Sequence, residues 1–278
     1  MQCRDRPLIY SFLPLLSLFL SCGDGGPTSA TSAGAKDDLP GAIVGKAPPP
    51  SGTAVHYFEE NRAATGYLSI PKSGGPHPAV ILIHEWNGLG DRVRQVGDAL
   101  SGEGYIALAV DLFSGKTGSN RSENMALVQE ARAHPERLIE NLNAAVRFLR
   151  DRDDVTGKIG AMGWCFGGGV ALSFALEGEN HDATAIFYGR LLDNPEKLKQ
   201  LSHEIYGTFA ANDRGIPVKS VNRFAAALRQ AGVPNDIHIY DDVDHGFWLW
   251  VERDPDLARG PAADAWSRLK TYLKRTLH

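Results

Sequence analysis

The stretch from residue 159 to residue 169, Ile-Gly-Ala-Met-Gly-Trp-Cys-Phe-Gly-Gly-Gly, limits the possible folds of this chain more than any other. Its apolar first half is typical of a buried strand, and its glycines predict a tight turn into a helix. Gly163 and Gly167 are needed because side chains two residues from the cysteine would collide there. The helix N-terminus directs unpaired N–H groups at Cys165, which favours a thiolate. Cys165 is therefore predicted to be a nucleophile, and a small buried cysteine that only permits close packing is the alternative.

The first 22 residues have the features of an export signal. Arg4 and Arg6 precede a run without charges from residue 7 to residue 20, too short to span a membrane comfortably and suited to a signal peptide. The run ends in Leu-Ser-Cys-Gly, which resembles a bacterial lipobox. We expect residues 1–22 to be a lipoprotein-type signal peptide with Cys22 as the lipidated residue, on a protein that faces the periplasm or the cell surface. Ordinary cleavage nearby and an uncleaved anchor are the alternatives.

Residues 23–53 are rich in Gly, Ser, Thr, Ala and Pro. Such a composition buries too little apolar surface to offset the entropy of ordering, so it predicts a flexible tether. Residues 54–278 then form one domain. The whole chain carries a formal net charge of −4 and residues 1–22 carry a net +1, which leaves −5 for the remainder. No basic stripe is visible, so nucleic acid is not an expected partner, and the lipid anchor is the only expected contact with a membrane.

Short apolar runs alternate with helical patterns along the domain. Strands are expected at residues 55–58, 66–70, 79–83, 105–110, 158–162, 183–187, 205–210 and 236–240. Helices are expected at residues 91–101, 136–150, 218–231 and 262–277. This alternation predicts an α/β fold, a mostly parallel sheet with helices on both faces.

Two residues are candidates to activate Cys165, and each follows a predicted strand. Asp213 comes shortly after the strand that ends at residue 210, and His245 after the strand that ends at residue 240. Parallel strands place such residues at one edge of the sheet, and the order nucleophile, acid, histidine is that of α/β-hydrolases. Asp241, Asp242 and Asp244 are rival acids, and His203 and His238 are weaker candidates for the base.

Residues 84–88, His-Glu-Trp-Asn-Gly, follow the most apolar strand. The tight strand-to-helix turn that carries a catalytic nucleophile is called a nucleophile elbow. In enzymes with such an elbow, this loop and the residue after the nucleophile donate the two N–H groups of an oxyanion hole. The backbones of Trp86 and Phe166 are the candidates. Glu85 is unusual here, since a carboxylate beside an oxyanion hole repels the developing charge; a helix cap or a solvated side chain is the plain alternative.

The chain resembles the dienelactone hydrolase family over about residues 54–278. The motifs that carry the resemblance are residues 163–168, 84–85, 187–189 and 245–247 and the Asp213 loop. The resemblance implies an α/β-hydrolase fold and a Cys–His–Asp hydrolase that cleaves an ester or lactone through an acyl-thioester. In that family the glutamate that matches Glu85 contacts the resting thiol and releases it when substrate binds.

One position departs from the best-known members of that family, which hold a substrate carboxylate with an arginine four residues after the histidine. Leu249 stands there, within Phe-Trp-Leu-Trp at residues 247–250, and an apolar side chain cannot pair with a carboxylate. Arg190 and Arg121 are other candidates for the mouth of the site, or solvated surface residues. The reaction type is therefore expected to carry over, and the dienelactone substrate is not.

The expected partner is a small-molecule ester or lactone, with no metal and no cofactor, and the oligomeric state is open. A tethered binding or scaffold protein with a relic site is the alternative from another class, and it predicts that no ester acylates Cys165. A cysteine-elbow protein of the glutamine-amidotransferase type is a third interpretation. The Asp213 and His245 loops after the elbow favour the hydrolase.

Overall fold

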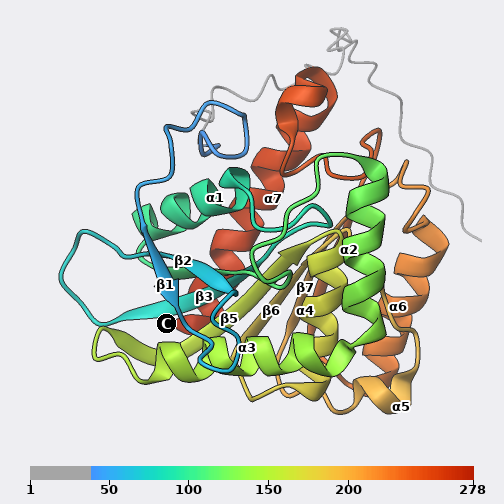
Figure 1. Ribbon diagram of the computed structural model, residues 1–278. Coiled ribbons are helices and arrows are strands. Elements are labelled where there is room, and N and C mark those ends of the chain that lie inside the picture. The colour runs from blue at the N-terminus through green and yellow to red at the C-terminus, as the bar shows by residue number, and fades with distance from the viewer. Residues whose placement is uncertain (1–38) are drawn as a thin grey trace, which may run out of the picture. The chain divides into compact units, whose positions relative to one another are not determined.

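A computed structural model describes residues 39–278 (Figure 1); the predicted signal peptide, with Cys22, and the first part of the predicted tether lie outside these residues. A single eight-stranded sheet has the order β1-β2-β4-β3-β5-β6-β7-β8. Its strands are β1 (Thr53–His56), β2 (Thr65–Ser69), β3 (His77–Ile83), β4 (Ile106–Val110), β5 (Val155–Trp164), β6 (Ala183–Phe187), β7 (Ile205–Ala210) and β8 (Asn235–Tyr240). The strands β3 to β8 pair in parallel, whereas β1 and β2 are antiparallel.

Helices cover both faces of the sheet (Figure 1). They are α1 (Asp91–Gly102), α2 (Arg121–Ala133), α3 (Pro135–Arg150), α4 (Phe166–Glu177), α5 (Pro195–Leu198), α6 (Val218–Ala231), the 3-10 helix η1 (Val251–Arg253) and α7 (Pro255–Leu277). The apolar residues of α1 and α7 share one core cluster, and those of α2, α3 and α4 share another on the opposite face. None of the helices within residues 39–278 combines the length and apolar character that a membrane span requires.

Strand β3 shows why the sheet has this form. Its residues alternate between the two cores: Val80 and Leu82 contact the cluster of α1 and α7, and Ile81 and Ile83 contact the opposite one. A strand covered on both faces is continuously apolar. Its neighbours are β4 and β5, with Ile83 opposite Gly163. The parallel strands therefore end at one edge, where residues 84–88 meet the turn after β5.

The predicted elements are confirmed as an α/β fold, with differences among the helices. Helix α7 begins at Pro255 rather than at residue 262, with Pro261 inside it. The short helices α5 and η1 were not predicted, and neither was α2. The side chain of its N-cap residue Asn120 accepts from the backbone N–H of Glu123 at 3.1 Å, and the Glu123 carboxylate accepts from Ser119. This reciprocal cap was the available sequence signal.

Residues 39–53, within the predicted tether, contact the domain instead. Ile43 is fully buried, and its carbonyl accepts a hydrogen bond from the backbone N–H of Val251 at 3.3 Å. The carbonyl of Ala42 accepts from Arg92 of α1. The structure thus corrects the predicted domain boundary at residue 54, because a short apolar segment among Gly and Pro residues finds a buried site on the folded chain.

Candidate active site

The turn at Cys165 has the strained geometry of an elbow. Cys165 has φ 55° and ψ −114°, in a region that side chains rarely adopt. A Cβ at Gly163 would lie 2.3 Å from the carbonyl oxygen of Gly167, and one at Gly167 would lie 2.3 Å from that of Ile83. The two glycines are therefore required, as predicted. The close approach also fixes Cys165 against the end of β3, which carries residues 84–86.

The structure brings Asp213 and His245 together. One carboxylate oxygen of Asp213 accepts a hydrogen bond from His245 Nδ1 at 2.6 Å. The other accepts from the backbone N–H groups of Gly215 and Ile216 at 2.7 and 3.0 Å. Asp213 is only 5% exposed, so its carboxylate cannot turn toward solvent. These bonds hold the imidazole in one orientation, with Nε2 facing away from Asp213.

The thiol of Cys165 acts on the His245 ring as well, since it raises the pKa of the imidazole. Burial lowers the pKa of His245, but the hydrogen bond to Asp213 and the influence of the Cys165 thiol outweigh it and raise the pKa to about 10. Burial likewise raises the pKa of Asp213, and the hydrogen bond from His245 lowers it below its usual value. The site therefore favours a protonated imidazole beside the carboxylate of Asp213.

The rival acids and bases are placed elsewhere. His203 Nε2 contacts Thr184 at 2.8 Å, and His238 contacts Arg268 at 3.1 Å. Neither Asp241, Asp242 nor Asp244 makes a hydrogen bond to His245, among the contacts of residues 39–278. Tyr188, which follows β6 with φ 39°, lies edge-on to the His245 ring at 4.9 Å.

The two predicted oxyanion donors lie beside the elbow. Phe166 is the first residue of α4, so its N–H has no partner inside the helix. Trp86 lies two residues after His84, whose carbonyl contacts Gly167. Neither N–H group donates to any other residue within the described part of the chain. Both groups are thus unpaired, the N–H of Phe166 at the turn that holds Cys165 and the N–H of Trp86 in the loop after β3.

Glu85 is buried next to the same turn. It is 8% exposed, and its carboxylate accepts a hydrogen bond from Trp250 Nε1 at 2.7 Å. Burial raises the pKa of Glu85, although the Trp250 hydrogen bond and the charges of His245, Arg253 and Arg92 act against it. No hydrogen bond joins Glu85 to Cys165 among the described residues.

Residues 246–253, here called the tryptophan loop, differ from the apolar wall that the sequence predicts. Leu249 and Trp248 are fully buried in the core beneath the site. Leu249 therefore presents no side chain to a ligand. Trp250 is only partly buried, and the guanidinium groups of Arg92 and Arg253 lie 4.5 and 4.4 Å from its ring centroid. Sequence reasoning missed Trp250, Arg92 and Arg253, because their roles depend on contacts between distant segments.

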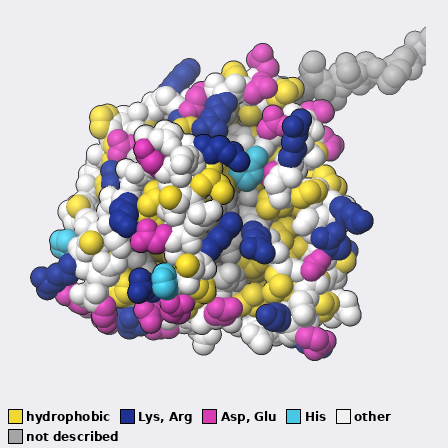
Figure 2. Space-filling model, turned by 45° about the vertical axis from the view of Figure 1, so that its right-hand side comes forward, with side chains coloured by type: hydrophobic (Ala, Val, Ile, Leu, Met, Phe, Trp, Pro, Cys, Tyr) yellow, Lys and Arg dark blue, Asp and Glu magenta, His cyan; other side chains and the backbone are white. Residues whose placement is uncertain are grey.

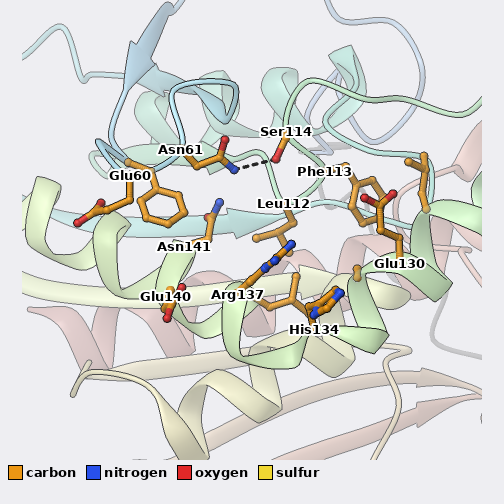
Figure 3. Close-up of a pocket in the computed structure, with 14 residues that line it drawn as sticks. Glu60, Asn61, Leu112, Phe113, Ser114, Glu130, His134, Arg137, Glu140 and Asn141 are labelled. Carbon is orange, nitrogen blue, oxygen red and sulfur yellow. Dashed lines mark hydrogen bonds between the residues drawn. The ribbon is translucent and has the colours of Figure 1, made fainter.

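A cavity of about 330 Å³ lies between α2, α3 and the loop after β4 (Figure 3). Leu112, Arg137 and His134 line it, and Asn61 donates to Ser114 Oγ at 2.8 Å across its upper rim. None of Cys165, Asp213 and His245 is among its lining residues. Its wall residue Phe113 contacts the ring of Phe166, with ring centroids 5.4 Å apart.

The surface carries charges of both signs. On the face shown in Figure 2, Lys and Arg side chains border a hollow between hydrophobic side chains, and Asp and Glu side chains lie nearby. The figure shows no broad patch of a single sign on this face.

Known proteins with similar sequences point to a single family. The model of the dienelactone hydrolase family matches residues 64–277. A protein of Methylorubrum extorquens, provisionally named carboxymethylenebutenolidase, is 27% identical over 222 residues, which cover 75% of this chain and 76% of that protein. A protein of Aquifex aeolicus with the same provisional name is 29% identical over 228 residues, or 78% of this chain and 97% of that protein.

Solved structures agree on the fold. A dienelactone hydrolase-like promiscuous phosphotriesterase from metagenomic libraries has a TM-score of 0.69 at 21% identity, over 77% of this chain and 93% of that chain. An esterase of Thermogutta terrifontis has a TM-score of 0.61 at 16% identity, over 81% and 92%. At such identities the likeness establishes the α/β-hydrolase fold alone. With the family match spanning most of the chain, the protein belongs to the dienelactone hydrolase family and is an ester or lactone hydrolase.

Proposed function

We propose that this protein hydrolyses a carboxylic ester or lactone with Cys165 as nucleophile, His245 as acid and base, and Asp213 as the residue that orients His245. The observation that carries the proposal is the 2.6 Å hydrogen bond between Asp213 and His245, a ring whose pKa the thiol of Cys165 also raises. The orienting acid and the base are thus hydrogen-bonded to each other, and in this proposal the nucleophile pairs with the other ring nitrogen of His245.

The first half-reaction forms an acyl-enzyme. The Cys165 thiolate, paired with protonated His245, attacks the carbonyl carbon, and the N–H groups of Trp86 and Phe166 hold the oxygen that becomes negative. When the tetrahedral intermediate collapses, the C–O bond breaks and His245 gives its proton to the leaving alkoxide. The product is a thioester on Cys165 and a neutral imidazole.

The second half-reaction uses water. Neutral His245 removes a proton from a water molecule, and the resulting hydroxide attacks the thioester carbonyl. Collapse breaks the C–S bond, which releases the acid and restores the thiolate–imidazolium pair. Asp213 keeps Nδ1 protonated throughout, so Nε2 is the atom that exchanges protons. No step requires a metal or a cofactor.

The position that binds a carboxylate in related enzymes bears on the substrate of the proposed reaction. The best-known members of the family bind a substrate carboxylate with an arginine at the position of Leu249. Leu249 is apolar and fully buried, so it cannot take that role. Arg190 and Arg121 are exposed, and neither forms an ion pair among the described residues. We therefore propose an ester or lactone without a required carboxylate at this position.

Replacement of Cys165 tests the mechanism. Cys165→Ala should reduce hydrolysis of a small aryl ester by about 10⁴-fold or more, while thermal unfolding stays close to that of the native protein. Intact-mass measurement after brief exposure to a panel of esters and lactones should show an added acyl group on the native protein and none on the variant. Turnover that survives in Cys165→Ala would rule out the thioester route. A relic site in a binding or scaffold protein predicts no acyl adduct from any ester.

We also propose that the protein is exported and tethered to a membrane through lipid on Cys22. The support is the sequence of residues 1–23, which lies outside the described residues. Expression in a bacterial host with labelled palmitate should place label on the native chain and none on Cys22→Ser. Equal labelling of both chains would contradict the assignment.

A further inference from the structure

The carboxylate of Glu85 lies within the site but bonds to a residue that the proposed mechanism does not use. We propose that Trp250 is a positioning residue, which holds Glu85 away from Cys165 so that the thiol remains paired with His245. This inference rests on the proposed function, because it takes Cys165 as the nucleophile. It assigns a role to the tryptophan loop that goes beyond the triad and the oxyanion donors.

The position of Glu85 makes such control necessary. Glu85 follows His84, whose carbonyl lies against Gly167 of the elbow. Glu85 also directly precedes Trp86, a proposed oxyanion donor. A carboxylate free to turn toward the elbow would oppose the negative charge that develops on the substrate oxygen. It would also accept a proton or a hydrogen bond from the thiol in competition with His245.

The indole N–H supplies the restraint. Trp250 Nε1 donates to Glu85 Oε2 at 2.7 Å, and this is the only side-chain hydrogen bond of Glu85 among the described residues. At 8% exposure, Glu85 has little solvent to replace that donor. A buried carboxylate without a donor is costly, so it would move to another donor within reach. His245 is near enough for its charge to act on Glu85.

The indole ring is itself fixed by two arginines. The guanidinium carbons of Arg92 and Arg253 lie 4.5 and 4.4 Å from the ring centroid, a cation–π arrangement. Arg92 also forms an ion pair with Glu252 of the tryptophan loop and donates to the carbonyl of Ala42. The position of the indole therefore depends on α1, on the tryptophan loop and on residues 39–53 together.

Trp250→Phe tests the inference, because it removes the N–H donor and keeps an aromatic ring for the arginines. We expect kcat/KM for a small aryl ester and the iodoacetamide alkylation rate of Cys165 each to fall about tenfold. In a Glu85→Gln background the same substitution should change neither quantity, since no carboxylate remains to be released. Trp266→Phe is the matched control: its indole nitrogen is buried without a hydrogen-bond partner among the described residues, so both rates should stay at native values.

The double-variant comparison separates the possible outcomes. An equal fall in both Glu85 backgrounds means that Trp250 acts only as a structural residue, which overturns the inference. Native rates in Trp250→Phe overturn it as well, and leave the proposed function intact if Cys165→Ala is inactive. Turnover in Cys165→Ala would instead remove the proposed function.

A measurement on the native ring covers the case in which Trp250→Phe does not fold. The chain has five tryptophans, so nitrogen-15 spectra should contain five indole N–H signals. One signal should lie downfield and shift in Glu85→Gln, as a charge-assisted hydrogen bond requires. If none of the five signals responds to Glu85→Gln, the inference is wrong.

Discussion

The elbow and the tryptophan loop both position groups at the site, but they do so by different means. The elbow at residues 163–169 is set by the backbone: its glycines lie against carbonyl oxygens with no room for a Cβ. The tryptophan loop is set by side chains that reach across the fold, as Trp250 does to Glu85 over 165 residues of sequence. The difference teaches that the nucleophile is fixed locally, whereas its surroundings are fixed by distant contacts.

The two regions should therefore respond differently to substitution. A change in the elbow meets rigid backbone and cannot be absorbed by a rotated side chain. A change in the tryptophan loop removes one of several contacts and leaves the others in place. The loop also depends on residues 39–53 through Val251 and Arg92, so part of the site depends on a segment that precedes the first strand.

The largest expected effect comes from the elbow. Gly167→Ala places a methyl group 2.3 Å from the carbonyl oxygen of Ile83 and 2.4 Å from that of His84. Backbone on both sides must shift, so we expect the free energy of unfolding to fall by about 4 kcal/mol or more. Urea unfolding measures this change.

Gly102→Ala is the matched control, since Gly102 ends α1 and a Cβ there meets nothing within 4 Å. It should leave stability unchanged or raise it by about 0.5 kcal/mol. Similar losses in both variants would show that the elbow is no more rigid than an exposed helix end.

The same contrast explains how much the sequence could predict. Gly163, Gly167, Cys165, Asp213 and His245 were identified because each sits in a local pattern: a glycine turn, or a polar residue just past an apolar strand. The parallel strands then had to gather them at one edge of the sheet. Local patterns carry this information because backbone sterics act over a few residues.

Contacts between distant segments left no such pattern. Trp250 stood in an apolar run and gave no sign that it would donate to Glu85, while Leu249 beside it is buried. Residues 39–53 had the composition of a tether, yet Ile43 fills a position in the core. A short apolar run, residues 42–44, among glycines and prolines is too weak a signal to reveal a buried contact.

A smaller effect should come from the segment that supports the tryptophan loop. Ile43 is fully buried, and truncation of a buried isoleucine typically costs 2 to 5 kcal/mol. We expect Ile43→Ala to lower the free energy of unfolding by about 2 kcal/mol. Lys46→Ala, at an exposed position of the same segment, should change it by less than about 0.5 kcal/mol. Equal, small changes in both would mean that residues 39–53 do not belong to the folded unit.

The smallest effect is expected from the Asp213–His245 pair, in which His245 immediately precedes the tryptophan loop. The pKa of His245 is raised to about 10 in the folded protein, against about 6.5 in an unfolded chain. A raised pKa contributes stability that is complete below the unfolded value and is lost as pH rises through the folded value. The contribution should therefore be full at pH 6 and largely absent at pH 10.5.

Asp213→Asn removes the carboxylate that holds the proton on His245. It should lower the free energy of unfolding more at pH 6 than at pH 10.5, and urea unfolding at both values measures the difference. Because the His245 side chain is 36% exposed, solvent screening limits this difference to about 1 kcal/mol. Asp244→Asn is the control, since Asp244 is exposed and makes no hydrogen bond to His245 within the described residues. A loss in Asp213→Asn that is the same at both pH values would show that Asp213 acts through its bonds to Gly215 and Ile216 and not through the charge on His245.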